Sequence, residues 1–140
     1  MKKNMDKQGF SLIEVMVAFG ILTLALVSLV GAFPNALAIN KGAENISIAS
    51  YLAQDKMEEI NSDDYSAIAT GTIEALHRLS ADPGNYLYNF ERETKVYSVD
   101  QDLQATSTDT GLKIASTTVY YADAHKNKKN YNLLLLINLK

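Results

Sequence analysis

The uncharged stretch from Val15 to Phe33 is the strongest feature in the pattern of apolar and polar residues. A helix of these nineteen residues would be about 28 Å long at 1.5 Å per residue. That length matches the roughly 30 Å hydrocarbon core of a bilayer. Glu14 stands immediately before the stretch, and a short basic segment precedes both. The pattern therefore predicts a membrane-spanning helix near the N-terminus.

The segment from Asn35 to Asn61 has a different, amphipathic pattern. Apolar or small residues recur in alternating steps of four and three, which is the spacing of one helical face. One helix cannot bury its own apolar stripe, so we expect a sheet of the same chain or other helices to cover it. The predicted stripe consists of Ile39, Ala43, Ile46, Ser50, Ala53, Met57 and Ile60.

The remainder of the chain predicts a small antiparallel sheet. Runs rich in aromatic and β-branched residues predict strands at 86–99, 112–122 and 131–139. Packing such a sheet on the helical stripe gives an α+β roll. A short helix is expected at 73–79, because its apolar residues fall on one side of a helix.

Two details of these strands are also predicted. The apolar face of the first run changes phase near Glu91 to Glu93, which indicates a bulge or bend there. Residues Leu133 to Ile137 are apolar on both faces, so we expect the last strand to be central or covered. Polar loops are expected at 100–111 and, with several basic residues, at 123–130.

Composition narrows the classes of function. The chain of 140 residues has no cysteine, so a disulfide framework, a Cys-containing zinc site and a thiol nucleophile are all excluded. The net charge is −3. Three lysines and one aspartate give the first nine residues +2, so the rest carries −5. An acidic body argues against general nucleic-acid binding, which requires neutralisation of phosphates.

Three interpretations of the N-terminus compete. A cleaved export signal would use Ala36-Leu37-Ala38 as its small-residue cleavage site. However, the apolar run is longer than such a signal needs, and Glu14 lies between the basic leader and that run. A plain membrane anchor explains the length and the basic leader. It leaves Glu14 and the preceding Gly-Phe pair unexplained.

The third interpretation rests on residues Lys7 to Val15, which read Lys-Gln-Gly-Phe-Ser-Leu-Ile-Glu-Val. They resemble the type IV prepilin signature shared by pilins, minor pilins and type II secretion pseudopilins. The resemblance implies that a prepilin peptidase cuts between Gly9 and Phe10 and then N-methylates Phe10. Glu14 becomes the fifth mature residue, the position at which the family has an acid.

Glu14 and Pro34 each have two interpretations. An ionised carboxylate near hydrocarbon is costly unless it is paired. The resemblance implies that Glu14 pairs with the N-terminal amine of a neighbouring subunit; the alternative is that it lies solvated in the headgroup layer. Pro34 removes a helical hydrogen bond. It either kinks the helix, as the resemblance implies, or ends the membrane-spanning segment.

The resemblance implies a pilin-like organisation of the chain. Residues 1–9 are the leader, 10–34 the transmembrane and filament-core half of a long helix, 35–62 its amphipathic half, and 63–140 the globular sheet domain. The protein is then a structural filament subunit and not an enzyme. Many major pilins close a C-terminal loop with a disulfide, so the missing cysteines and the short body favour a minor pilin or pseudopilin.

The resemblance also implies partners and location. They are the prepilin peptidase, other pilin subunits and the inner-membrane assembly platform, with a single-pass anchor and the C-terminal domain outside the cytoplasm. The protein would then join a type IV pilus or a type II secretion-like filament. An alternative from another class is a membrane-anchored or secreted binding domain with an ordinary export signal.

No metal, cofactor or nucleic-acid site is expected. His77 and His125 have no Ser, Cys or His partner at a diagnostic spacing. Asp100-Gln101-Asp102 alternates carboxylates but lacks the glycine and distal glutamate of an EF-hand. The lysines at 126–129 lack interleaved aromatic residues, which favours a solvated hairpin tip over contact with DNA.

Overall fold

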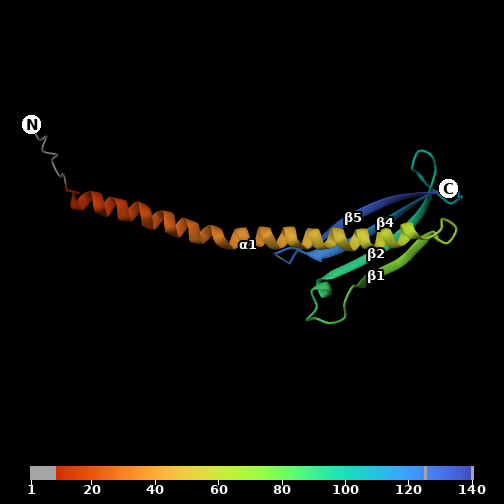
Figure 1. The fold of residues 1–140 in the computed structure, drawn as a ribbon, viewed down its shortest axis with the longest axis horizontal. Helices are drawn as coiled ribbons and strands as arrows, with labels where there is room; N and C mark the ends of the chain where they lie inside the picture. The colour runs from red at the N-terminus through yellow and green to blue at the C-terminus, as the bar shows by residue number, and fades with distance from the viewer. Residues whose placement is uncertain (1–8, 125, 140) are drawn as a thin grey trace, which may run out of the picture. The chain divides into compact units, whose positions relative to one another are not determined.

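The computed structural model describes residues 9–124 and 126–139. The basic leader up to Gln8, and His125, lie outside these residues, so the predictions made for them stay predictions. The chain divides into two compact units between Leu37 and Ala38, which we describe separately. Figure 1 shows the order of elements, with one long helix followed by the strands of a sheet.

The first unit consists of the N-terminal part of helix α1 (Leu12–Ser62). Its apolar side chains are exposed along the whole segment. Its two hydroxyl groups are satisfied within the helix, because Thr23 Oγ1 donates to the Phe19 carbonyl at 2.7 Å and Ser28 Oγ to the Leu24 carbonyl at 2.8 Å. Such internal pairing is what a hydrocarbon environment requires of polar groups.

Pro34 lies inside α1, which continues to Ser62. Pro34 therefore does not end the helix, and the alternative that it ends the membrane-spanning segment stays a prediction. Whether Pro34 bends the helix stays a prediction.

The second unit is an antiparallel sheet with the C-terminal part of α1 against one of its faces (Figure 1). The strand order is β1-β2-β4-β5, and the short β3 pairs with the end of β2. This confirms the predicted α+β fold, with five strands rather than the expected three. The elements are β1 (Gly71–Arg78), the 3-10 helix η1 (Tyr86–Asn89), β2 (Phe90–Val99), β3 (Ala105–Thr106), β4 (Leu112–Ala122) and β5 (Lys128–Asn138).

The core lies between α1 and the covered face of the sheet. Alternate residues of β4 are buried from Lys113 to Tyr121, as the period of a strand requires. Ala49 and Ala53 are fully buried in α1, and such small side chains let the helix backbone approach the strands closely. Two apolar clusters fill this layer: Ala49, Ala53, Phe90, Val119 and Tyr121 form one, and Met57, Ile60, Ile68, Val96 and Ala115 form the other.

The predicted helical stripe is correct at its C-terminal end and wrong at its N-terminal end. Met57 and Ile60 are buried, whereas Ile39 and Ile46 remain 71% and 48% exposed. The sheet is too short to cover them: β4 ends at Ala122, whose carbonyl accepts a hydrogen bond from Asn45 Nδ2 at 2.8 Å. These apolar side chains of α1 therefore remain open to other partners.

The short helix predicted at 73–79 is wrong, because this segment forms β1 and pairs with β2. The helical spacing of its apolar residues misled the prediction. Ile73 and Leu76 are exposed, and the side chain that turns inward is Glu74. Its carboxylate accepts hydrogen bonds from Arg92 and from Thr94 Oγ1. When a polar residue occupies the inward position of a strand, the alternation of apolar residues that would predict the strand is missing.

The predicted bulge at Glu91 to Glu93 is also wrong. The register of β2 with β4 is unbroken from Phe90 to Ser98. The apparent change of phase arises because β2 buries the polar residues Thr94 and Ser98 on the same face as Phe90 and Val96, whereas Tyr97 is 44% exposed. The residues before the strand, Tyr86–Asn89, form a 3-10 helix capped by Asn85, whose side chain accepts a hydrogen bond from the Leu87 amide. The register shifts lie instead in β1, on either side of Glu74.

The last strand is an edge strand, not the central or covered strand that was predicted. Leu133, Leu135 and Ile137 pack towards α1. Leu134 and Leu136 point to the other face and are 61% and 54% exposed. The apolar run in β5 therefore does not mean that both faces are covered: one face packs in the core and the other is exposed.

Lys113 is a buried cation that the sequence did not single out. Its Nζ donates to the Tyr65 carbonyl at 3.0 Å and to the Ile68 carbonyl at 2.7 Å. It also lies 4.0 Å from the centroid of the Tyr65 ring. Burial and a hydrogen bond to Asp109 raise the pKa of Tyr65 to about 12. These contacts fasten the chain that leaves α1 to the end of the sheet.

Candidate functional site: the N-terminal junction

The first candidate site is the junction that precedes α1. Gly9, Phe10 and Ser11 have no regular secondary structure, and the helix begins at Leu12. The Ser11 carbonyl accepts hydrogen bonds from the amides of Glu14 and Val15, at 3.0 and 3.2 Å. The Phe10 side chain is 82% exposed, and a Cβ atom built on Gly9 would meet no atom within 4 Å. Gly9 and Phe10 thus lie on exposed, irregular backbone before the helix.

Glu14 lies in the first turn of α1, one turn from Phe10. The two residues line a surface hollow of about 420 Å³ with Val15, Ala18, Phe19 and Leu22. Glu14 is the sole charged residue between Gly9 and Asn40. A carboxylate at a helix N-terminus interacts favourably with the helix dipole. In hydrocarbon it still requires a cation, and within its own helix the first one is Lys41.

The apolar surface of this unit must also be covered. Large apolar side chains are exposed from Phe10 to Phe33, far beyond the patch size that a soluble monomer usually leaves open. By length and composition, α1 can cross a membrane. The site is therefore the Glu14 carboxylate and an exposed Gly9–Phe10 junction at the start of a helix suited to a bilayer or to other helices.

Comparison with known families gives a match that covers this junction. Residues 4–30 match the family model of the prokaryotic N-terminal methylation motif. The chain carries the type IV prepilin signature. No match was found among curated proteins, and none among solved structures.

The prepilin signature includes Gly9, Phe10 and Glu14, which the sequence had indicated and which the structure keeps in one short stretch. It implies processing by a prepilin peptidase and assembly with pilins in a membrane. Pro34 lies outside the matched residues. The matched region ends within α1, so the signature carries no information on the sheet domain.

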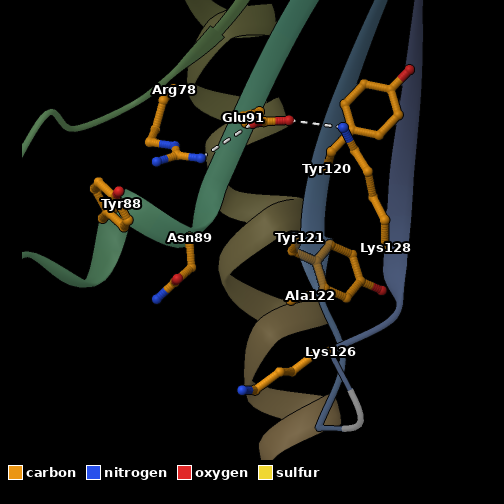
Figure 2. A pocket seen from close by; sticks show the side chains of 9 residues that line it. All are labelled: Arg78, Tyr88, Asn89, Glu91, Tyr120, Tyr121, Ala122, Lys126 and Lys128. Atoms are coloured by element: carbon orange, nitrogen blue, oxygen red, sulfur yellow. Dashed lines mark hydrogen bonds and ion pairs between the residues drawn. The ribbon is translucent and has the colours of Figure 1, made fainter. Parts of the chain in front are cut away.

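A second candidate site was missed by the sequence analysis. A pocket of about 260 Å³ opens at one end of the sheet domain (Figure 2). Arg78 from the end of β1 and Lys128 from the start of β5 lie on opposite sides of Glu91, with Nη2–Oε1 and Nζ–Oε2 distances of 3.6 and 2.8 Å. Lys126 enters from the β4–β5 loop. No periodic pattern relates Arg78 to Lys126, so only the folded chain brings them together.

Aromatic rings order two of these cations. The Arg78 guanidinium lies 4.2 Å from the centroid of the Tyr88 ring, and Lys128 Nζ lies 4.5 Å from that of Tyr120. The hydrogen bond and charge of Lys128, with help from Arg78, hold the pKa of Glu91 below its ordinary value. Lys128, one of the lysines expected in a solvated hairpin tip, is therefore held in place by contacts with residues of the sheet.

The residues discounted as metal or catalytic groups have structural contacts. His77 lies 3.7 Å from Glu74 and 3.0 Å from the Ala75 carbonyl. Asp100 Oδ1 accepts hydrogen bonds from the amides of Asp102 and Gln104, which closes its own loop. Within residues 9–124 and 126–139, no group of three acidic, His or Cys side chains is arranged to hold a metal ion.

Proposed function

We propose that the chain is a minor pilin or pseudopilin, a structural subunit of a type IV pilus or a type II secretion-like filament. The observation that carries the proposal is the methylation motif at residues 4–30 at the start of a helix whose large apolar side chains are exposed from Leu12 to Phe33. The precursor is cut between Gly9 and Phe10 by prepilin peptidase, and Phe10 is N-methylated. The subunit waits in the inner membrane with its sheet domain outside the cytoplasm.

Glu14 then registers the subunit during assembly. After cleavage, the amine of Phe10 is the cation nearest to Glu14 along the chain. In a packed filament, the Glu14 carboxylate pairs with the Phe10 amine of a neighbouring subunit. Pairing removes the cost of an isolated charge among apolar helices. The apolar segment serves first as the bilayer anchor and afterwards as part of the filament core.

Two further features support a filament subunit. The apolar residues Ile39 and Ile46 lie on α1 outside the cover of the sheet, where neighbouring helices can pack on them. The chain has no cysteine, unlike many major pilins, which favours a minor pilin or pseudopilin.

The proposal predicts incorporation into filaments that depends on processing. An epitope-tagged chain should appear in the sheared filament fraction of cells that contain prepilin peptidase, and should stay in the membrane fraction when the peptidase is inactivated. An export-signal protein would leave the membrane in both strains. Detection of the tag in medium or periplasm regardless of the peptidase would contradict the filament role and favour a secreted binding domain.

A further inference from the structure

The pocket in Figure 2 has a charge opposite to that of the chain around it. Its lining contains three cations, Arg78, Lys126 and Lys128, and one carboxylate, Glu91, so its formal charge is +2. The whole chain has a net charge of −3. Within the described parts of the chain, Lys126 makes no ion pair. The Asp123 carboxylate on the same loop accepts hydrogen bonds from the amide and side chain of Asn127. The pocket therefore attracts a small anion.

The pocket is built to hold that anion. Stacking of Arg78 on Tyr88 and of Lys128 on Tyr120 restricts both cations before any ligand arrives, which lowers the entropy cost of binding. A guanidinium presents a planar fork of donors that matches the oxygens of a phosphate. A volume of about 260 Å³ is below the roughly 300–1,000 Å³ of common ligand pockets. This size suits one headgroup better than a polymer.

The position of the pocket along the chain identifies the source of the anion. The pocket residue Ala122 accepts a hydrogen bond from Asn45 of α1 at 2.8 Å. Asn45 is four residues beyond Lys41, the first charged residue after the uncharged run from Val15. The pocket therefore lies beside the part of α1 that follows the apolar segment most closely along the chain.

We propose that this pocket binds the phosphate group of an anionic phospholipid, and so holds the sheet domain on the membrane surface before assembly. The inference rests on the membrane-anchored state in the proposed function. A phosphodiester carries one negative charge and can accept from Arg78, Lys126 and Lys128 together. Glu91 acts as the internal counter-ion that the phosphate displaces. Extraction of the subunit into a filament then requires release of this lipid.

The two arginines of the chain give a direct test. Arg78 lines the pocket, whereas Arg92 is bonded to Glu74 and to the Leu52 carbonyl beneath the sheet. In the full-length chain in non-ionic detergent micelles, the two Nε–H NMR signals report on pocket and core separately. Addition of phosphatidylglycerol should shift the Arg78 signal in a saturable way and leave that of Arg92 unchanged. Phosphatidylcholine at the same concentration should shift neither signal. Inorganic phosphate should shift the Arg78 signal much less than phosphatidylglycerol, because only the lipid is concentrated at the micelle surface.

Variants sharpen this test. Each basic residue near an anionic surface contributes about fivefold in affinity, so Lys126→Gln with Lys128→Gln should weaken the affinity reported by the Arg78 signal roughly 25-fold. Glu91→Gln should strengthen it, because the competing carboxylate is lost. Lys95→Gln, which removes a lysine paired with Glu93 outside the pocket, should have little effect. Unchanged thermal midpoints would show that the variants fold.

Three outcomes would overturn the inference. The Arg78 signal could stay fixed with phosphatidylglycerol, it could respond equally to inorganic phosphate, or the double lysine variant could bind as well as the original chain. The mass of the mature N-terminus separates this inference from the proposed function. A processed N-terminus with an unresponsive Arg78 overturns only the lipid site. An unprocessed chain with a responsive Arg78 overturns only the filament role.

Discussion

Glu14→Ala is expected to leave membrane insertion and cleavage intact and to reduce incorporation into filaments at least tenfold. The apolar run and the Gly9–Phe10 junction are unchanged, so the chain still enters the membrane and meets the peptidase. The amine of Phe10 loses its partner among packed helices, and loss of one partner of a buried charge pair costs about 2–5 kcal/mol. The measurement is the ratio of tagged subunit in sheared filaments to that in membranes.

A matched control is Glu58→Ala, which removes an exposed carboxylate from the same helix outside the apolar segment. This variant should enter filaments normally. Glu14→Asp keeps the charge and should retain part of the incorporation. Normal incorporation of Glu14→Ala would remove the proposed role of Glu14, and would favour a carboxylate that is merely solvated in the headgroup layer.

Arg92→Ala is expected to destabilise the sheet domain by about 3 kcal/mol. Arg92 Nη2 lies 2.9 Å from Glu74 Oε1, and Nη1 donates to the Leu52 carbonyl at 3.1 Å. Both side chains of the ion pair are only 12% exposed. Truncation of Arg92 leaves the nearly buried carboxylate of Glu74 without its cationic partner. The measurement is thermal or denaturant unfolding of the full-length chain in a mild detergent.

Lys95→Ala is the control for Arg92→Ala, because it breaks an ion pair with Glu93 on the uncovered face of the sheet. Exposed pairs of this kind contribute about 0–1 kcal/mol. If Arg92→Ala lowers the free energy of unfolding no more than Lys95→Ala does, the Glu74–Arg92 pair does not hold the sheet to α1.

The same ion pair makes stability dependent on pH. Burial alone would raise the pKa of Glu74, but hydrogen bonds from Arg92 and Thr94 outweigh it and lower the pKa below 4.5. A carboxylate with a lowered folded-state pKa stabilises the fold fully above its unfolded-state pKa, and this contribution is lost as pH falls through the folded-state value. The difference in stability between the original chain and Glu74→Gln should therefore be constant near pH 7 and shrink below about pH 4.5.

The parts of the fold that the sequence predicts correctly are those with one regular pattern. β4 occupies residues 112–122 as predicted, because its residues alternate strictly between the core and the open face. The long helix follows from an apolar run joined to an amphipathic one. β1 was missed because its inward residue is Glu74, and the pairing that selects a strand there comes from Arg92 and β2.

The two candidate sites differ in the same way. Gly9, Phe10 and Glu14 are neighbours in sequence, so the junction can be recognised without a fold. The anion pocket draws Arg78, Tyr88, Glu91 and Lys128 from β1, η1, β2 and β5. The positive charge of the pocket arises only when these strands pair. The helix predicted at 73–79 would not have placed Arg78 beside Glu91.

The mass of the mature N-terminus tests the central claim most directly. The protein should be purified from cells that contain an active prepilin peptidase, and its N-terminal peptide identified by mass spectrometry. The account predicts a chain that begins at N-methylated Phe10, and a chain that retains Gly9 in cells without the peptidase. A mature start at Ile39, after Ala36-Leu37-Ala38, or an intact Met1 in cells with the peptidase, would contradict it.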